Sequence, residues 1–189
     1  MKKIPTIFRK SMNTGLVSDE PNPLCDWVFS GEGIVTRKYD GACTKIENGK
    51  YYKRRTIKKG KTPPLDFIEV DFDSNTGKRF GWSEVSLSNE DKYYREVLPI
   101  ESLPNGTYEL VGPKIQGNVE KFDRYILIRH LGAIAYEGVP RTFSGLKEWL
   151  SHMDIEGLVF HHPDGRMGKI KKKDFGLKRD ADNNGRDIR

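Results

Sequence analysis

The chain has 189 residues, a length that suits one large domain and suffices to bury a hydrophobic core without disulfides or metals. Hydrophobic residues make up 35% and charged residues 32%, which favours a folded protein with a polar surface and excludes a disordered chain. Neither a secretory signal nor an apolar run long enough to span a membrane is visible. The two cysteines, Cys25 and Cys43, show no metal-site spacing and fit a reducing compartment. We therefore expect an intracellular protein, in the cytoplasm or the nucleus, that does not bind membranes.

The charge is moderately positive, with 33 Lys and Arg against 27 Asp and Glu and a formal net charge of +6. The basic residues gather in two clusters: Lys53, Arg54, Arg55, Lys58, Lys59 and Lys61, and then Lys169, Lys171, Lys172, Lys173, Lys178 and Arg179. Such clusters indicate a polyanionic partner, either nucleic acid or a nucleoside triphosphate. Two solvated basic faces would give the same pattern, so charge alone does not decide between them.

The first half of the chain reads mainly as strands. Residues 1–30 are mixed and predict only short elements, and residues 34–37 predict a strand. A hairpin follows, in which residues 42–47 and 50–55 flank Asn48-Gly49, the dipeptide that a type I′ turn requires. Residues 58–64 form a basic loop, residues 67–72 a strand and residues 75–77 a turn.

The second half adds two helices and further strands. Ser88 is a candidate N-cap for a short helix that ends before Pro99, and residues 107–112 and 125–131 predict strands. Ser144 is a candidate cap for a helix with apolar residues at helical spacing. Residues 157–162 and 167–173 form a second hairpin. The fold class is therefore α+β, with antiparallel sheets in one domain over residues 1–178 and a polar tail over 179–189 that we expect to be frayed.

The first candidate for chemistry is Lys38-Tyr39-Asp40-Gly41, at the end of a predicted strand. Alternation places Lys38 and Asp40 on one face, and Gly41 permits a tight turn or a close approach to a ligand. A lysine becomes a nucleophile when burial or neighbouring cations lower its pKa. An ordinary charged strand end that leads into a turn would have the same sequence pattern. For the tetrapeptide alone, this ordinary interpretation is favoured over a nucleophilic lysine.

A second candidate lies in the C-terminal hairpin, where Glu156 precedes one strand and Lys169 and Lys171 alternate along the other. A carboxylate and two lysines on one sheet face are suited to holding Mg²⁺ and a triphosphate. Cross-strand ion pairs on a solvated face are the ordinary alternative. A third acid, Glu109, lies in a predicted strand that could equally be a plain amphipathic one.

In this order the segments resemble the motif series of the covalent nucleotidyltransferases, which comprise DNA ligases, RNA ligases and mRNA capping enzymes. The resemblance runs from Thr36 to Gly176. Three longer runs, 31–41, 108–118 and 156–176, are most similar to the 5′-to-3′ RNA ligases of vertebrates and of some large viruses and phages. The third run, with Glu-Gly-Leu-Val-Phe at 156–160 and Lys-Ile-Lys at 169–171, is the longest and most specific.

The resemblance implies a nucleotidyltransferase domain of two antiparallel β-sheets with flanking helices. The chain has no room after the last motif for the oligonucleotide-binding barrel of DNA ligases and capping enzymes, so we expect no C-terminal barrel. The resemblance further implies ATP and Mg²⁺ (or Mn²⁺) as cofactors. It implies RNA with 5′-phosphate and 3′-hydroxyl ends as the partner, as in RNA repair. A monomer is the default expectation.

The resemblance also implies roles for individual residues. Lys38 would become adenylylated, Lys169 and Lys171 would neutralise the α-phosphate, and Glu156 would lie beside the nucleotide and its Mg²⁺. The remaining nucleotide-binding positions are Thr36, Arg37, Asp40, Gly41, Arg55, Glu109 and His130. Among these, Glu109 and Arg55 would hold the ribose, with Arg54 as the substitute for Arg55, and His130 is the candidate for stacking on adenine.

Three alternatives remain open at this stage. Within the superfamily they are a small DNA ligase and a guanylyltransferase that uses GTP. Outside catalysis, the chain could be a nucleic-acid-binding module that has kept the fold. A basic globular protein with chance matches is disfavoured by the ordered series.

Overall fold

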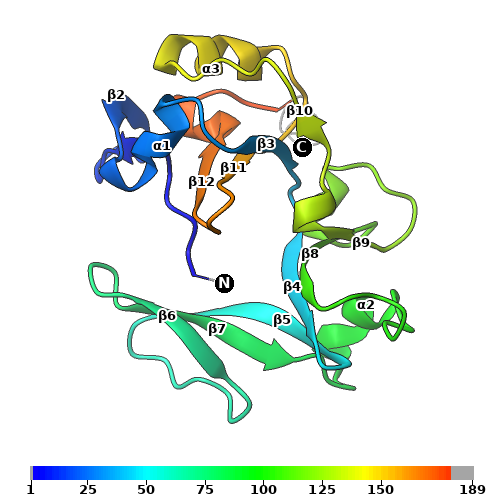
Figure 1. Ribbon diagram of the computed structural model, residues 1–189. Coiled ribbons are helices and arrows are strands. Elements are labelled where there is room, and N and C mark those ends of the chain that lie inside the picture. Colours follow the sequence, from blue (N-terminus) through cyan, green and yellow to red (C-terminus); the bar gives the residue numbers. More distant parts are fainter. Residues whose placement is uncertain (1, 180–189) are drawn as a thin grey trace, which may run out of the picture. The chain divides into compact units, whose positions relative to one another are not determined.

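The computed structural model describes residues 2–179 and has two compact units (Figure 1). The first unit consists of residues 40–132 together with Lys2 and Lys3, and the second of residues 4–39 and the described residues from 133 onward. The chain passes between them at Lys3–Ile4, at Tyr39–Asp40 and at Gly132–Ala133. The predicted Lys-x-Asp-Gly motif is therefore divided, with Lys38 in the second unit and Asp40 and Gly41 in the first.

The first unit is built on a six-stranded antiparallel sheet with the strand order β6-β7-β5-β4-β8-β9. Its strands are β4 (Ala42–Glu47), β5 (Lys50–Ile57), β6 (Ile68–Asp73), β7 (Lys78–Glu84), β8 (Gly106–Val111) and β9 (Ile126–Arg129). The predicted β4–β5 hairpin is confirmed, and both turn residues have the positive φ that a type I′ turn needs, 53° at Asn48 and 73° at Gly49.

One face of this sheet is covered by the segment after β7. That segment contains η2 (Asn89–Asp91) and α2 (Lys92–Arg95), shorter than the predicted helix, and Ser88 precedes them without a side-chain capping bond. Tyr94 and Val97 pack there against Ile46 and Tyr108. Because side chains alternate along a strand, the register places the odd-numbered residues of β5 on this covered face and the odd-numbered residues of β8 on the opposite face.

The second unit is built on a four-stranded antiparallel sheet with the order β10-β3-β11-β12, beside a two-stranded ribbon. The sheet strands are β3 (Ile34–Lys38), β10 (Ala135–Tyr136), β11 (Gly157–His161) and β12 (Met167–Lys171), and the ribbon strands are β1 (Phe8–Lys10) and β2 (Val17–Pro21). The helical elements are η1 (Pro23–Cys25), α1 (Asp26–Phe29), α3 (Phe143–Ser151) and η5 (Lys172–Phe175). Two further 3-10 turns, η3 (Gln116–Asn118) and η4 (His130–Gly132), belong to the first unit.

The core of the second unit lies on one face of its sheet. Leu158, Phe160 and Ile170 are fully buried there, and α3 packs on them through Leu146 and Leu150. The prediction that Ser144 caps this helix was wrong. Thr142 is the N-cap, and its hydroxyl accepts a bond from the Gly145 N–H at 3.2 Å. Both residues are good capping types, and only the extended backbone at Thr142 decides between them.

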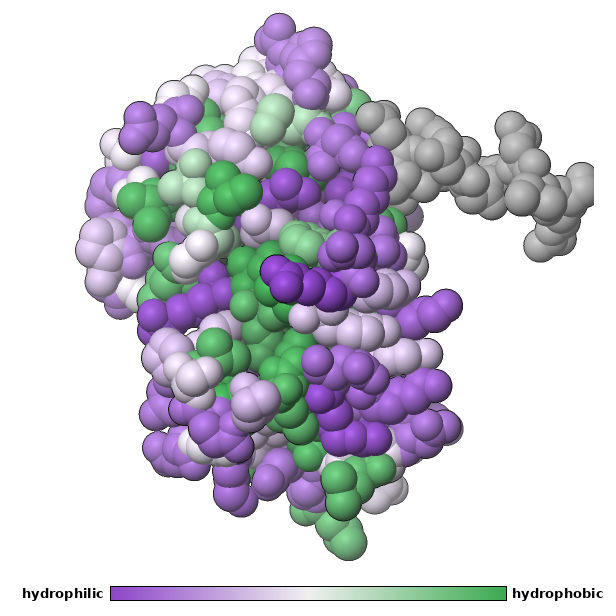
Figure 2. Space-filling model, turned by 90° about the vertical axis from the view of Figure 1, so that its right-hand side faces the viewer, coloured by the Kyte–Doolittle hydropathy of each residue, from purple (hydrophilic) through white to green (hydrophobic). Residues whose placement is uncertain are grey.

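The predicted α+β class with antiparallel sheets and few helices is confirmed. Hydrophilic residues dominate the face of the molecule shown in Figure 2, in agreement with the composition. Within residues 2–179, every helix is too short or too polar to cross a lipid bilayer. Arg179 is buried and bonds Asp154, and the rest of the predicted tail lies outside the described residues.

Candidate functional site

Three lysines and one glutamate gather on the four-stranded sheet, away from the face that carries the hydrophobic core. Register sets this arrangement, because Gly157 of β11 pairs with Lys38 of β3 on one side and with Lys171 of β12 on the other. Glu156, immediately before Gly157, accepts a bond from Lys38 Nζ at 2.5 Å through Oε2 and a second, short bond from Lys171 Nζ through Oε1. Residues separated by 118 positions in sequence thus share one carboxylate.

Gly157 is required at the centre of this cluster. A Cβ atom built on Gly157 would lie 2.1 Å from the Ile170 carbonyl oxygen, a contact that real Cβ atoms do not make. The missing side chain lets β11 and β12 approach, so that Lys171 reaches Glu156. We refer to Lys38, Glu156, Lys169 and Lys171 as the lysine cluster.

Charge in the lysine cluster is unbalanced. Burial opposes the ionisation of Glu156, but attraction to Lys38 and Lys171 outweighs it and the pKa of Glu156 is lowered. For Lys169, burial and repulsion from Lys171 and Lys38 lower the pKa to about 8. Among the described residues, no carboxylate forms an ion pair with Lys169. Lys169 therefore lies beside two further amines, and a bound anion such as a phosphate would neutralise its charge.

Two further predicted residues lie on β3, next to the lysine cluster. Thr36 is buried, and its hydroxyl lies 2.9 Å from His161 Nε2. The Arg37 backbone N–H donates to the Ile134 carbonyl at 2.8 Å, and the Arg37 guanidinium lies over the Tyr39 ring. Much of this backbone is thus engaged by the neighbouring strands β10 and β11.

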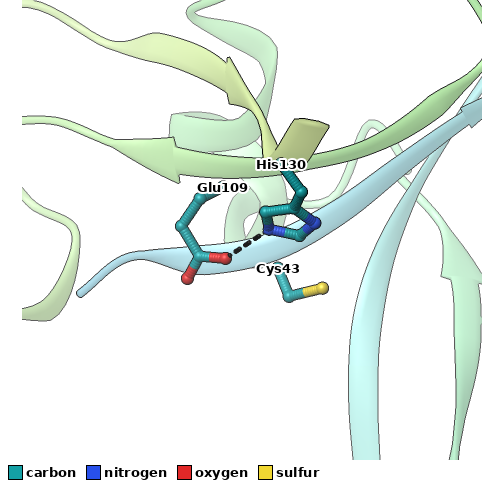
Figure 3. Close-up of side chains that lie close together, drawn as sticks. All are labelled: Cys43, Glu109 and His130. Carbon is teal, nitrogen blue, oxygen red and sulfur yellow. Dashed lines mark hydrogen bonds and ion pairs between the residues drawn. The ribbon is translucent and has the colours of Figure 1, made fainter. Parts of the chain in front are cut away.

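Glu109 and His130 are brought together in the first unit (Figure 3). Glu109 Oε2 lies 2.9 Å from His130 Nε2, and His130 Nδ1 lies 2.9 Å from the Thr107 hydroxyl. Glu109 Oε1 accepts a 3.2 Å bond from the Gly41 N–H. His130 begins the turn η4, directly after β9 ends, so it lies at the end of the predicted strand.

Gly41 and Asp40 have structural partners in the first unit. A Cβ on Gly41 would lie 2.3 Å from the Leu110 carbonyl oxygen, so the glycine permits β4 to approach β8 closely. The Asp40 backbone N–H donates to Glu120 at 3.0 Å. The close approach that Gly41 allows is thus one between two strands of the sheet.

Arg55 and Glu109 project from opposite faces of the six-stranded sheet. Cys43 pairs directly with Glu109, and Thr44 pairs with Lys53, so alternation puts Arg54 on the face of Glu109 and Arg55 on the other. Arg55 Nη2 lies 3.5 Å from Glu90 on the η2 side. Arg54 lies over the Phe80 and Trp82 rings. The structure therefore brings the substitute, Arg54, and not Arg55, to the face of Glu109.

The two predicted basic clusters are less exposed than the sequence suggested. Lys53 is buried and bonds Asp91, and Lys172 is buried with its ammonium donating to the Met153 carbonyl at 2.7 Å. Arg179 is buried as well. The exposed basic side chains of the two clusters are Lys58, Lys59, Lys61, Lys173 and Lys178.

Sequence reasoning missed two residues of these sites. His161 was not among the predicted site residues, yet it lies on the same face as the lysine cluster and contacts Thr36. Cys43 was treated as an ordinary free thiol, yet its Sγ lies near Glu109 and His130. Strand alternation could have placed His161, because it is four residues beyond Gly157; no local signal joins Cys43 to residues 66 and 87 positions away.

The chain matches no protein-family model. It is similar to a protein of Danio rerio named RNA ligase 1, with 28% identity over 105 residues. That segment covers 50% of this chain and 32% of the relative, so the chain spans only part of that protein.

Proposed function

We propose that this chain is an ATP-dependent RNA ligase, which joins a 5′-phosphate RNA end to a 3′-hydroxyl end, and that Lys38 carries the AMP. The observation that carries the proposal is the lysine cluster, in which Lys38 and Lys171 both bond Glu156 and the neighbouring Lys169 has a lowered pKa. The similarity to RNA ligase 1 of Danio rerio supports the same class of reaction.

The proposed reaction has three steps. In the first, Lys38 Nζ attacks the α-phosphorus of ATP, an N–P bond forms, the bond to the bridging oxygen breaks and pyrophosphate leaves. In the second, the 5′-phosphate of RNA displaces the lysine and takes the AMP. In the third, the 3′-hydroxyl of the other end attacks that phosphate, and AMP leaves. Such transfers depend on positioning and charge neutralisation, which fixed lysines supply.

Glu156 controls the nucleophile in this proposal. A carboxylate 2.5 Å from an amine favours its protonated form, which cannot attack. Lys38 therefore has to release Glu156 and lose a proton to solvent before the first step. Lys169 and Lys171 bind the phosphate oxygens. The pKa of Lys169, lowered to about 8, leaves this lysine partly neutral at neutral pH and above.

Magnesium fits Glu156 poorly in this arrangement. Both carboxylate oxygens of Glu156 bond ammonium groups, and Mg²⁺ prefers free oxygen ligands. We propose that Mg²⁺ (or Mn²⁺) arrives on the triphosphate, where it neutralises charge, and that Glu156 serves Lys38 and Lys171 directly.

The ribose and the base are assigned to residues named above. Glu109 accepts bonds from the ribose hydroxyls, and Arg54 replaces Arg55 as the arginine, because Arg54 shares the sheet face of Glu109. His130 holds the Glu109 carboxylate and offers its ring to adenine. The adenine edge is read by polar groups near Thr36 and Arg37, but not by the Arg37 N–H, which is already bonded. Asp40 and Gly41 complete the Lys-x-Asp-Gly motif beside the nucleotide.

The test is intact mass spectrometry with ATP or GTP and Mg²⁺, followed by joining of a 5′-phosphate RNA. We expect a gain of one AMP with ATP and joined RNA, both lost in Lys38→Ala. Lys147→Ala, an exposed lysine of α3 in the same unit, should behave like the wild type. Labelling by GTP would indicate a guanylyltransferase, joining of nicked DNA only would indicate a DNA ligase, and RNA binding without labelling would indicate a non-catalytic module.

A further inference from the structure

Cys43, Glu109 and His130 form a cluster of metal-ligand types in the first unit. One donor atom from each, a thiol sulfur, a carboxylate oxygen and an imidazole nitrogen, lies within 4.8 Å of the other two. In Figure 3 the Glu109 carboxylate and the His130 ring face each other, with Cys43 beside them. The three residues come from β4, β8 and the turn after β9, which are neighbours in the sheet.

We propose that Cys43, Glu109 and His130 bind a Zn²⁺ ion, with a fourth position open to solvent or to a ligand. Sulfur, nitrogen and oxygen donors in this combination suit zinc, whereas magnesium and calcium prefer oxygen alone. Three protein ligands with one open position are typical of zinc sites that exchange ligands.

Zinc binding requires only small movements of the three side chains. Ligand atoms on one tetrahedral zinc lie roughly 3.3–3.7 Å apart, given zinc–ligand bonds of about 2.0–2.3 Å. Glu109 Oε2 and His130 Nε2, at 2.9 Å, are hydrogen-bonded, so they have to move apart by roughly half an ångström and release the shared proton to solvent. The Cys43 thiol has to approach them and lose its proton to solvent on binding.

Two of the three ligands are held by partners behind them. The Thr107 hydroxyl contacts His130 Nδ1, which fixes the ring and leaves Nε2 toward Glu109. The Gly41 N–H bonds Glu109 Oε1, which leaves Oε2 toward His130. Such outer contacts orient the ligands of established metal sites.

The site is open to solvent, so an ion can enter. Glu109 is buried, but Cys43 and His130 are only partly covered, and the His130 side chain is 23% exposed. The metal site shares Glu109 and His130 with the proposed nucleotide pocket. Bound zinc would therefore exclude the ribose, and this consequence, unlike the metal site itself, rests on the proposed function.

The test of the metal site is a titration of the full chain with Co²⁺, which replaces Zn²⁺ and gives a thiolate charge-transfer absorption. We expect one equivalent to bind with this absorption, and zinc to displace it. Cys43→Ala should abolish the absorption and weaken binding at least about tenfold, and His130→Ala should weaken binding similarly. Cys25→Ala is the matched control, because Cys25 is buried in the other unit. Thermal unfolding of each metal-free variant establishes that it is folded.

Binding and absorption that persist in Cys43→Ala, or that disappear only in Cys25→Ala, would overturn the metal site. The shared pocket is tested by zinc inhibition of AMP labelling, with each variant compared with itself without zinc. The wild type should be inhibited more than Cys43→Ala. Equal inhibition of the two would contradict the sharing of Glu109 and His130. Cobalt binding through Cys43 in a chain that ATP never labels would keep the metal site and remove the proposed function. Normal labelling without Cys43-dependent cobalt binding would do the reverse.

Discussion

The six-stranded sheet holds a buried lysine and the four-stranded sheet holds half-buried ones, and their charges have different partners. In the six-stranded sheet, Lys53 is 6% exposed and is matched by one carboxylate, Asp91, which is 1% exposed. In the four-stranded sheet, Lys38 and Lys171 share Glu156, and Lys169 has no ion pair among the described residues. In a balanced buried pair each charge offsets the burial cost of the other, whereas a lysine without a carboxylate carries that cost until an anion binds. The imbalance therefore distinguishes a candidate site from structure.

Breaking the balanced pair should have the largest effect on stability. Asp91→Ala leaves the Lys53 ammonium buried without a partner and removes the bonds that Asp91 accepts from Ser86. We expect a loss of about 3–5 kcal/mol in the free energy of unfolding, measured by urea denaturation. Glu90→Ala, the exposed neighbour, should change it by about 1 kcal/mol or less. Similar losses in both variants would contradict the structural role of the pair.

Removing the shared carboxylate should cost less, because Lys38 and Lys171 keep some access to water, with side chains 19% and 20% exposed. Glu156→Gln should lower the free energy of unfolding at pH 7 by about 1–3 kcal/mol. Because the folded-state pKa of Glu156 lies below the ordinary 4.5, its stabilisation is complete above that pH and is lost as the pH falls through the folded value.

The measurement is urea denaturation of both proteins from pH 7 down to pH 3. The stability difference should shrink toward acid, and the exposed Glu148→Gln on α3 should show no such trend. A difference that stays constant with pH would mean that the carboxylate charge does not stabilise the lysine cluster.

Removing the unpaired charge should have the opposite sign. Lys169→Met keeps the length of the side chain and deletes the buried ammonium, so it should stabilise the protein at pH 7 by about 1–2 kcal/mol while it lowers AMP labelling. With a folded pKa of about 8 and an unfolded value near 10.5, the wild type gains stability as the pH rises through this window.

The gain in stability from Lys169→Met should therefore decrease between pH 8 and pH 10. Thermal unfolding of both proteins across this pH range measures it. The exposed Lys173→Met, from the same basic cluster, should show no such dependence. A destabilised Lys169→Met variant at pH 7 would contradict the conclusion that this charge is uncompensated.

The smallest effect concerns the cap of α3. Thr142→Ala removes the bond to the Gly145 N–H and should cost about 1 kcal/mol, whereas Ser144→Ala should cost a few tenths at most. Thermal unfolding of the two variants compares the observed cap with the one that the sequence predicted. A larger loss in Ser144→Ala would restore the sequence-based assignment.

Local signals in the sequence were sufficient for the hairpins and for the face of the lysine cluster. Asn48-Gly49 fixed one turn, and the alternation of Lys169, Ile170 and Lys171 placed Ile170 in the core and the two lysines on the other face. Strand β7 was not predicted, because Gly81 interrupts its alternation of side chains at the point where the backbone approaches β6.

Pairing between distant segments was not predictable in the same way. The burial of Lys53 depends on Asp91, 38 residues away, and the approach of Cys43 to Glu109 and His130 depends on the order β4-β8-β9. The choice between Arg54 and Arg55 required the β4–β5 and β4–β8 registers together. These contacts follow from strand order, which a single sequence does not specify.

The most direct test of the account is to locate the modified residue after incubation with ATP and Mg²⁺. Peptide mapping at neutral to alkaline pH preserves the acid-labile N–P bond of a lysyl-AMP. The account predicts one AMP per chain, on Lys38, and no AMP on any lysine in Lys38→Ala. AMP on Lys169, the lysine with the lowered pKa, or no AMP on the wild type would contradict it.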